Sequence, residues 1–365
     1  MQYYLNTKLA QLGNHSDLKT GAVNPPIYMS TAYQHTALGN STGYDYTRTK
    51  NPTRTILEKG IADLEQGDYG FACSSGMAAI QLVLSLFSSG DEIIAPEDVY
   101  GGTYRLFKHY QEAYSLRIKY CGFNSVEEVE RCISSHTKAI FIETPTNPLM
   151  QEIDIATYVA LAKKHQLLFI VDSTFLTPIL QQPITLGADI VIHSATKYIG
   201  GHNDVLAGLV VTKGEQLSEK IATFHNASGA VLSPIDSWLL IRGLKTLSLR
   251  VKQQQKNAQE IARFLMKDTH IEQVLYPGKG GMLAFRLKKR EWVKDFLKNL
   301  KLITFAESLG GVESFVTYPM TQTHADIPEN ERISRGIDER LLRFSVGIED
   351  IADLIYDLKQ CFNRL

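Results

Sequence analysis

The sequence predicts an α/β fold with a mostly parallel central sheet, followed by a smaller α+β domain. From about residue 51 to 242, helical patterns alternate with short apolar runs, which is typical of a parallel sheet between helices. Two of these runs lead directly into a polar side chain that a ligand site could use. With 365 residues, 44% of them hydrophobic and 21% charged, the chain is long enough for two cores.

The order of the elements follows from periodicity and turn residues. Residues 1–48 are rich in Gly, Ser, Thr, Asn and Tyr and show little periodicity, which predicts an extended arm. We expect the α/β domain over residues 49–245 and the α+β domain over residues 246–365. The first helix expected in the α+β domain is polar-rich and runs from Gln253 to Met266. The expected helices of the α/β domain are Arg54 to Leu64, Met77 to Phe87 and Ile155 to His165, and its expected strands are Asp91 to Ala95, Ala139 to Ile142, Leu167 to Val171 and Ile190 to Ile192.

A single lysine, Lys197, follows the apolar run 188–192 and lies between two hydroxyl residues and a glycine pair. No other charged residue stands between Asp189 and Asp204. Its ammonium group should therefore lose a proton easily, as a Schiff-base lysine requires. A lone lysine in such a motif more often caps a helix or pairs with an acid, so the interpretation depends on a second residue.

That second residue is Asp172, which ends the apolar run 167–171 in the pattern of a buried parallel strand. Lys197 follows 25 residues later, after the length of a short crossover. Both strand ends should open onto the same sheet edge, where α/β proteins bind ligands. Pyridoxal phosphate fits this pair, because its aldehyde needs a lysine and its ring nitrogen needs an acid. Alone, Asp172 would be interpreted as a strand-end cap.

A phosphate site is predicted where small and hydroxyl residues lead into a helical pattern. Ser75, Gly76 and Met77 open that pattern, and a helix N-terminus offers an anion free N–H groups and a favourable dipole. The hydroxyls of Ser194 and Thr196, on either side of the lysine, could reach the same phosphate. Without them, the Ser-Ser-Gly turn would be an ordinary N-cap.

Composition excludes several classes of partner. The net charge is −1 and no basic stripe is present, so neither nucleic acid nor an anionic membrane is expected and the substrate should be small. Four cysteines show neither Cys-x-x-Cys spacing nor the density of a disulfide scaffold, which suits a reducing compartment. The start of the chain has no apolar leader region and no run approaches a membrane span, so we expect a cytoplasmic protein. His193 and His202 have no third ligand at metal spacing, so no metal site is expected.

Longer motifs carry a family resemblance. The run His-Ser-Ala-Thr-Lys-Tyr-Ile-Gly-Gly-His at 193–202, with 44–53 and Glu-Thr-Pro-Thr-Asn-Pro at 143–148, resembles the Cys/Met-metabolism family of pyridoxal-phosphate enzymes over essentially the whole chain. Within it, 305–314 and 342–349 are most similar to bacterial cystathionine γ-synthases and O-acetylhomoserine thiolyases. The resemblance implies a PLP-dependent transferase fold of the aspartate aminotransferase type, fold type I. It also implies a homotetramer, a dimer of dimers whose N-terminal arm contacts the neighbouring subunit.

The resemblance also implies roles for single residues. Tyr100 resembles the aromatic residue that stacks on the cofactor ring and deprotonates the incoming amine; otherwise it is a core tyrosine. Tyr46 and Arg48 resemble a pair that reaches the cofactor phosphate of a neighbouring subunit, where a planar guanidinium suits bidentate contacts; otherwise they belong to a solvated loop. Asn147 resembles the residue at the ring hydroxyl, and Arg343 the clamp for the substrate α-carboxylate; otherwise they are a turn residue and a surface arginine.

Specificity is also inferred by resemblance. An acid at Glu307, before Ser308, is similar to enzymes that make or use cystathionine, whose distal amino group needs an anion. Gly102 stands where methionine γ-lyases have a cysteine, which argues against that activity. Arg105 is a candidate for steering the leaving acyl end or the second carboxylate. Thr49 stands where synthases that use a succinyl ester often have a second arginine, so acetyl is favoured over succinyl.

The resulting hypothesis is a cystathionine γ-synthase of methionine biosynthesis, with O-acyl-L-homoserine and L-cysteine as substrates and Lys197, Tyr100 and Asp172 as catalytic residues. The alternatives are an O-acetylhomoserine sulfhydrylase, a cystathionine γ- or β-lyase, or a pyridoxal-phosphate-binding regulatory or scaffold protein without catalysis. Retention of these three residues together with Arg343 argues against the last of these.

Overall fold

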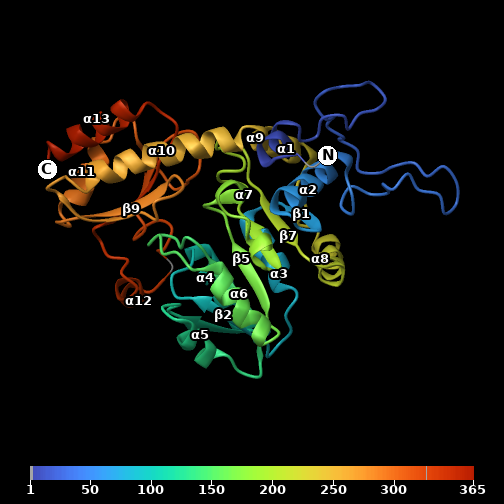
Figure 1. The fold of residues 1–365 in the computed structure, drawn as a ribbon, viewed down its shortest axis with the longest axis horizontal. Coiled ribbons are helices and arrows are strands. Elements are labelled where there is room, and N and C mark those ends of the chain that lie inside the picture. The colour runs from blue at the N-terminus through green and yellow to red at the C-terminus, as the bar shows by residue number, and fades with distance from the viewer. Residues whose placement is uncertain (1–2, 326) are drawn as a thin grey trace.

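A computed structural model describes residues 3–325 and 327–365. Its larger sheet has seven strands in the order β1-β7-β6-β5-β4-β2-β3 (Figure 1). Strand β7 is antiparallel to both of its neighbours and the other pairs are parallel, so the sheet is mixed but mostly parallel, as expected. The strands are β1 Tyr69–Cys73, β2 Glu92–Pro96, β3 Arg117–Cys121, β4 Thr137–Glu143, β5 Leu168–Asp172, β6 Ile190–His193 and β7 Gly208–Thr212.

Helices cover both faces of this sheet, because its central strands are apolar on both sides. In β6, Ile190 and Ile192 belong to one core with the residues of α3, whereas Val191 belongs to the opposite core with those of α2. Such a strand reads as a continuous apolar run, which is why it could be recognised from sequence. The helices of this domain are α2 Pro52–Glu65, α3 Gly76–Leu84, α4 Gly101–Tyr114, α5 Val126–Cys132, α6 Ile155–Lys164, α7 Thr177–Leu180, a 3-10 turn Pro183–Leu186, α8 Glu215–Ser228 and α9 Pro234–Lys245.

A long helix, α10 Leu247–Leu265, leads from the large domain into the small one (Figure 1). The small domain has a five-stranded sheet in the order β10-β11-β12-β9-β8 with a third core of its own. Its elements are β8 Ile271–Leu275, β9 Met282–Leu287, α11 Trp292–Asn299, β10 Thr304–Phe305, β11 Phe315–Thr317, α12 Glu329–Ser334, β12 Leu341–Ser345 and α13 Ile351–Phe362.

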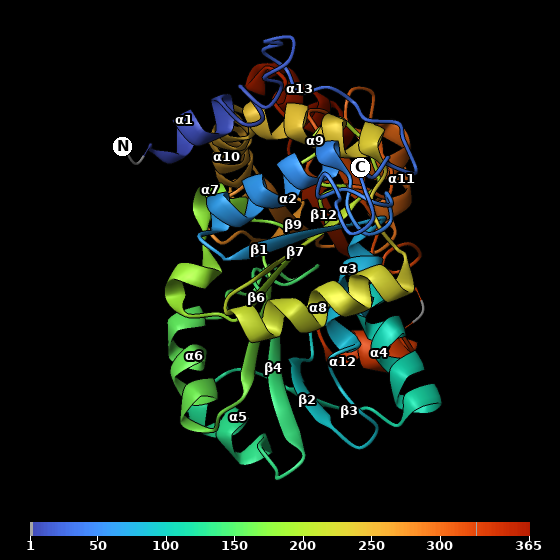
Figure 2. The same ribbon diagram turned by 90° about the vertical axis from the view of Figure 1, so that its right-hand side faces the viewer.

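The N-terminal arm consists mostly of loops that extend away from the domains (Figures 1 and 2). It also contains a short helix that sequence reasoning did not expect, α1 Leu5–Ala10. The helix forms because Leu9 is buried in the core of the large domain and Lys8 pairs with Asp63 at 2.7 Å. In contrast, Leu18 and Leu38 in the loops are fully exposed.

The α/β class and fold type expected from sequence are confirmed, and the helices and strands expected in the α/β domain differ from the observed ones by no more than three residues at either end. The long helix that we expected from Gln253 to Met266 begins earlier, at Leu247. It follows α9 almost without a break, so residues 243–250 are helical for most of their length. The structure also joins Cys121 to Cys132 in a disulfide, a pair that cysteine spacing did not single out. None of the described helices combines the length and the apolar character needed to cross a membrane.

Candidate active site

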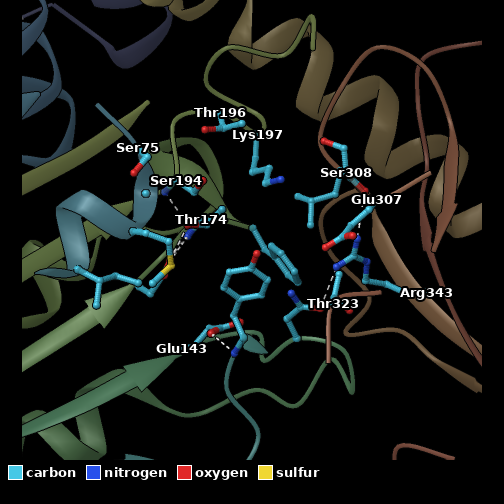
Figure 3. Close-up of a pocket in the computed structure, with 18 of the residues that line it drawn as sticks. Ser75, Glu143, Thr174, Ser194, Thr196, Lys197, Glu307, Ser308, Thr323 and Arg343 are labelled. Atoms are coloured by element: carbon cyan, nitrogen blue, oxygen red, sulfur yellow. Dashed lines mark hydrogen bonds between the residues drawn. The ribbon is translucent and has the colours of Figure 1, made fainter. Parts of the chain in front are cut away.

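A cavity lies where the carboxyl ends of β4, β5 and β6 face the small domain (Figure 3). Strand β4 ends at Glu143, β5 ends at Asp172, and β6 is followed closely by Lys197. The neighbouring strands keep these ends level, since Glu143 is in register with Asp172 and Asp172 with Ile192. Residues of the cavity wall that the sequence had indicated are Ser75, Gly76, Met77, Tyr100, Asn147, Asp172, Ser194, Thr196, Lys197, Glu307, Ser308 and Arg343.

Lys197 lies in a turn, where its backbone N–H donates to the carbonyl of Ser194 at 3.1 Å. Its side chain points into the cavity toward Glu307 (Figure 3). Burial, together with the positive charge of Arg343, lowers the pKa of Lys197 from 10.5 to about 8, while Glu307 acts in the opposite direction. The amine is therefore far closer to its neutral, nucleophilic form than a surface lysine, as the sequence had predicted.

Asp172 and Glu143 are two buried carboxyl groups on adjacent strands. Oδ1 of Asp172 accepts from the backbone N–H of Thr174 at 3.0 Å and from its hydroxyl at 2.6 Å. Glu143 accepts from the backbone N–H of Tyr100 at 2.9 Å. Burial raises the pKa of both groups, and that of Glu143 is raised further by the charge of Asp172. We infer that the pair holds its proton on Glu143 and its negative charge on Asp172.

The N-terminus of α3 forms a cradle beside these carboxyl groups. Ser75 caps the helix, because its hydroxyl accepts from the N–H of Ala78 at 3.0 Å, so the simple N-cap interpretation is correct for that side chain. Gly76 touches Ser194 so closely that a Cβ at position 76 would lie 2.8 Å from the Cβ of Ser194. The hydroxyl of Thr196 is engaged with the backbone of Ala207. The backbone N–H groups at the helix start and the Ser194 hydroxyl thus remain the best donors for a phosphate.

Tyr100 lies just before α4 and lines the cavity. A Cβ on Gly102 would lie 2.5 Å from its ring, so the missing side chain at position 102 gives the ring its place. Burial and the negative charge of Glu307 raise the pKa of Tyr100. The hydroxyl is therefore harder to deprotonate than that of a free tyrosine, while the charges of Arg343 and Arg105 act in the opposite direction.

Arg343 lies on β12, on the small-domain side of the cavity, and is 2% exposed. Its guanidinium donates to Oδ1 of Asn147 at 3.1 Å, to the carbonyl of Ser308 at 3.1 Å and to the hydroxyl of Thr317 at 3.0 Å. Within 3–325 and 327–365 no carboxylate forms an ion pair with it, and its Nε is buried without a partner. A buried guanidinium of this kind is well suited to bind the carboxylate of an amino acid.

Three expected site residues lie outside this cavity wall. Tyr46 and Arg48 are exposed on the N-terminal arm, where Arg48 Nε donates to Oδ1 of Asn226 at 3.3 Å and the guanidinium stacks on the ring of Tyr46. Arg105 is exposed on α4, and its charge lowers the pKa of Tyr100 against the effect of burial.

Sequence reasoning missed other residues of the wall. Glu143 could have been found, because it ends the apolar run 139–142 in the same way that Asp172 ends its own. Thr323 comes from a loop of the small domain and carries no such signal (Figure 3). The remaining wall residues that were not expected are Ile80, Pro145, Thr174, Phe175, Leu206 and Leu309.

The donor set fits pyridoxal phosphate. The amine of Lys197 can bind the aldehyde, the charge of Asp172 can pair with the ring nitrogen, and the α3 cradle can bind the phosphate. In each case the residue present has the charge and the hydrogen-bonding capacity that its part of the cofactor requires. The fold and this cavity together define a fold type I pyridoxal-phosphate enzyme.

Comparison with known proteins gives the family. A model described as Cys/Met metabolism PLP-dependent enzyme matches residues 6–363, and the chain belongs to this family. It is 61% identical over 365 residues to a cystathionine γ-synthase of Haemophilus influenzae, covering 100% of this chain and 99% of that protein. It is 62% identical to a Bacillus subtilis protein named cystathionine γ-synthase/O-acetylhomoserine (thiol)-lyase, covering 99% and 96%.

A solved structure of cystathionine γ-synthase from Xanthomonas oryzae pv. oryzae, in complex with aminoacrylate and cysteine, matches with a TM-score of 0.98 at 38% identity and covers 100% of this chain and 99% of that one. A cystathionine γ-lyase from Lactobacillus plantarum, complexed with L-serine, matches with a TM-score of 0.96 at 43% identity and covers 99% of each chain. The family resemblance and the cofactor expected from sequence are confirmed.

Proposed function

We propose that this protein is a cystathionine γ-synthase, which replaces the acyloxy group at Cγ of O-acyl-L-homoserine with the sulfur of L-cysteine. The C–O bond breaks and a C–S bond forms, so the products are L-cystathionine and the free carboxylic acid. The observation that carries the proposal is one cavity holding a lysine of lowered pKa, a buried arginine that has no ion pair among the described residues, and an acid at its rim, Glu307. The names of the relatives from Haemophilus influenzae and Bacillus subtilis support the same reaction.

Each residue has a defined task in this reaction. Bound pyridoxal phosphate supplies an aldehyde for the substrate amine and an electron sink for the Cα–H bond. Asp172 would hold the ring nitrogen in its protonated form, and Tyr100 would stack on the ring. Arg343 binds the α-carboxylate and so orients the Cα–H bond. The neutral amine of Lys197 would accept the proton from Cα and then move protons at Cβ while the γ-substituent leaves.

Glu307 and Thr49 bear on the choice of the second substrate and of the acyl group. We assign the Glu307 carboxylate to the amino group of the incoming cysteine, because Glu307 is an exposed acid whose charge raises the pKa of both Lys197 and Arg343. Acetyl is favoured over succinyl because Thr49 offers no positive charge for a distal carboxylate. Arg105 remains the candidate for steering a carboxylate at the entrance.

We also propose a homotetramer built from two dimers, with the arm 1–48 of one subunit on the next. Neither Tyr46 nor Arg48 lines the cavity of its own chain, yet the root of the arm is firmly fixed. The buried Arg54 donates to the carbonyl of Arg48 at 3.1 Å, and Asn226 accepts from the side chains of both Arg48 and Thr49. A fixed guanidinium away from its own site is suited to the phosphate of a neighbour. If so, inactive Arg48→Ala and Lys197→Ala proteins should regain activity when their subunits are exchanged.

The function is tested by product analysis. The purified protein is incubated with O-acetyl- or O-succinyl-L-homoserine and either cysteine or sulfide, and with cystathionine alone, and the products are identified by mass. Cystathionine from the ester and cysteine is the expected main product. Homocysteine as the dominant product would favour the sulfhydrylase reaction, which the double name of the Bacillus subtilis relative makes the second candidate. Cleavage of cystathionine without synthesis would contradict the proposal.

A further inference from the structure

Residues 318–325 and 327–336 of the small domain, called here the segment 318–336, lie against the large domain, and Figure 2 shows their helix α12 beside α4. Nη1 of Arg335 donates to the carbonyl of Glu97 at 2.9 Å, and the guanidinium stacks on the rings of Tyr104 and Tyr120. At the cavity, a Cβ on Gly101 would lie 2.1 Å from the carbonyl oxygen of Thr323. The two domains are therefore in backbone contact at the point where Thr323 enters the cavity wall.

His324 occupies the centre of this contact and is 1% exposed. Its Nε2 lies 2.9 Å from the carbonyl oxygen of Asn147, and its Nδ1 lies 2.8 Å from the hydroxyl of Thr323. A carbonyl only accepts, so Nε2 carries the proton and Nδ1 accepts from the Thr323 hydroxyl. Burial, together with the charges of Arg343 and Arg335, lowers the pKa of His324 to about 4 against the opposite effect of the carbonyls of Asn147 and Val99, so the ring is neutral at physiological pH.

Asn147 is thereby held by the small domain at two points. Its carbonyl accepts from His324, and its side-chain Oδ1 accepts from Arg343 at 3.1 Å. Because Oδ1 is used in this way, the amide N–H₂ of Asn147 is left for the cavity. The chain of bonds from Thr323 through His324 to Asn147 thus links a wall residue of the small domain to the loop after β4.

We propose that Thr323 and His324 form a positioning pair that holds the substrate-facing segment 318–336 on the Asn147 loop, and so sets the affinity for the amino-acid substrate. The pair touches no reacting atom. It acts through Asn147 and Arg343, and the inference rests on the proposed function in assigning Arg343 to the substrate carboxylate. A histidine that only filled space would need neither the Thr323 hydroxyl nor a donor toward Asn147.

Thr323→Val tests this directly, because it keeps the shape of the side chain and removes the hydroxyl. Loss of the hydroxyl leaves Nδ1 of His324 buried without a donor. We therefore expect KM for O-acetyl-L-homoserine to rise about 5- to 100-fold, with a smaller change in kcat. Thr323→Ser retains the hydroxyl and should recover most of the loss. His324→Gln retains an N–H donor for Asn147 and should be milder than His324→Leu. Tyr104→Phe is the matched control, since it removes the bond from α4 to Glu331 of the same segment, and neither residue lines the cavity.

A second measurement does not depend on turnover. Hydrogen exchange of peptides covering 318–336 should be faster in Thr323→Val than in the wild type, both with and without bound cofactor, while Thr323→Ser stays close to the wild type. Unchanged exchange together with a KM within twofold of the wild type for Thr323→Val would overturn the proposal. If the wild type showed no synthase activity, the proposed function would fail. The comparison of hydrogen exchange between Thr323→Val and the wild type would still test whether Thr323 and His324 hold this segment in place.

Discussion

The lowered pKa of Lys197 can be tested through two substitutions with opposite effects. A primary amine adds to an aldehyde only when it is neutral. With a pKa of about 8, roughly 20% of the lysine is neutral at pH 7.4, about 200-fold more than for a lysine that keeps its ordinary 10.5. The rate at which the cofactor-free protein captures aldehyde should therefore rise with pH and level off above about pH 8.

Arg343→Gln removes a positive neighbour and should raise the pKa of Lys197, whereas Glu307→Gln removes a negative one and should lower it. A shift of roughly half a unit to one unit in each direction corresponds to a three- to tenfold change in the neutral fraction below the pKa. The assay follows the absorbance of cofactor-free protein after addition of pyridoxal, which has no phosphate to bind at α3. Borohydride reduction and mass measurement then confirm that Lys197 is the labelled residue.

The two variants should displace the rate–pH profile to opposite sides of the wild type. A wild-type midpoint near 10.5, or displacement of both variants in the same direction, would refute this account of the site. Lys197→Met is the control, because any residual capture in that protein belongs to surface lysines.

Further predictions concern binding, selection and stability. Arg343→Ala should raise KM for every amino-acid substrate about 30- to 1,000-fold, measured by steady-state kinetics, and a change confined to one substrate would contradict its role as common clamp. Glu307→Ala should impair cystathionine formation far more than homocysteine formation from sulfide. Equal losses of the two activities would favour the sulfhydrylase reaction as the function of the protein. Glu65 and His193 form a buried pair with Oε1 and Nε2 2.7 Å apart. Glu65→Leu should reduce the free energy of unfolding by about 3–5 kcal/mol, and adding His193→Leu should recover part of it, as chemical denaturation would show.

The centre of the site was predictable because it follows from local pattern and sheet geometry. Asp172 and Lys197 each follow an apolar run, and parallel strands bring their carboxyl ends to one edge. Arg343 was identified only by resemblance, although a lone charge inside the buried strand Leu341–Ser345 is itself unusual.

The contribution of the small domain could not be predicted in this way. Thr323 reaches the cavity from a loop, and its neighbour His324 contacts the carbonyl of Asn147, 177 residues away in the chain. Neither periodicity nor local composition encodes a contact of that kind. The same limit applies to α1, whose helix depends on burying Leu9 against the large domain.

The cavity wall is assembled from segments spread between Ser75 and Arg343, so both domains must be folded and docked before it exists. The two largest causes of the low pKa of Lys197, its burial and the charge of Arg343, depend on that docking. While the chain is still emerging from the ribosome, Lys197 is an ordinary protonated lysine and reacts poorly with the aldehydes of the cell. The reactivity of Lys197 therefore depends on the small domain, which supplies Arg343 and completes the cavity wall.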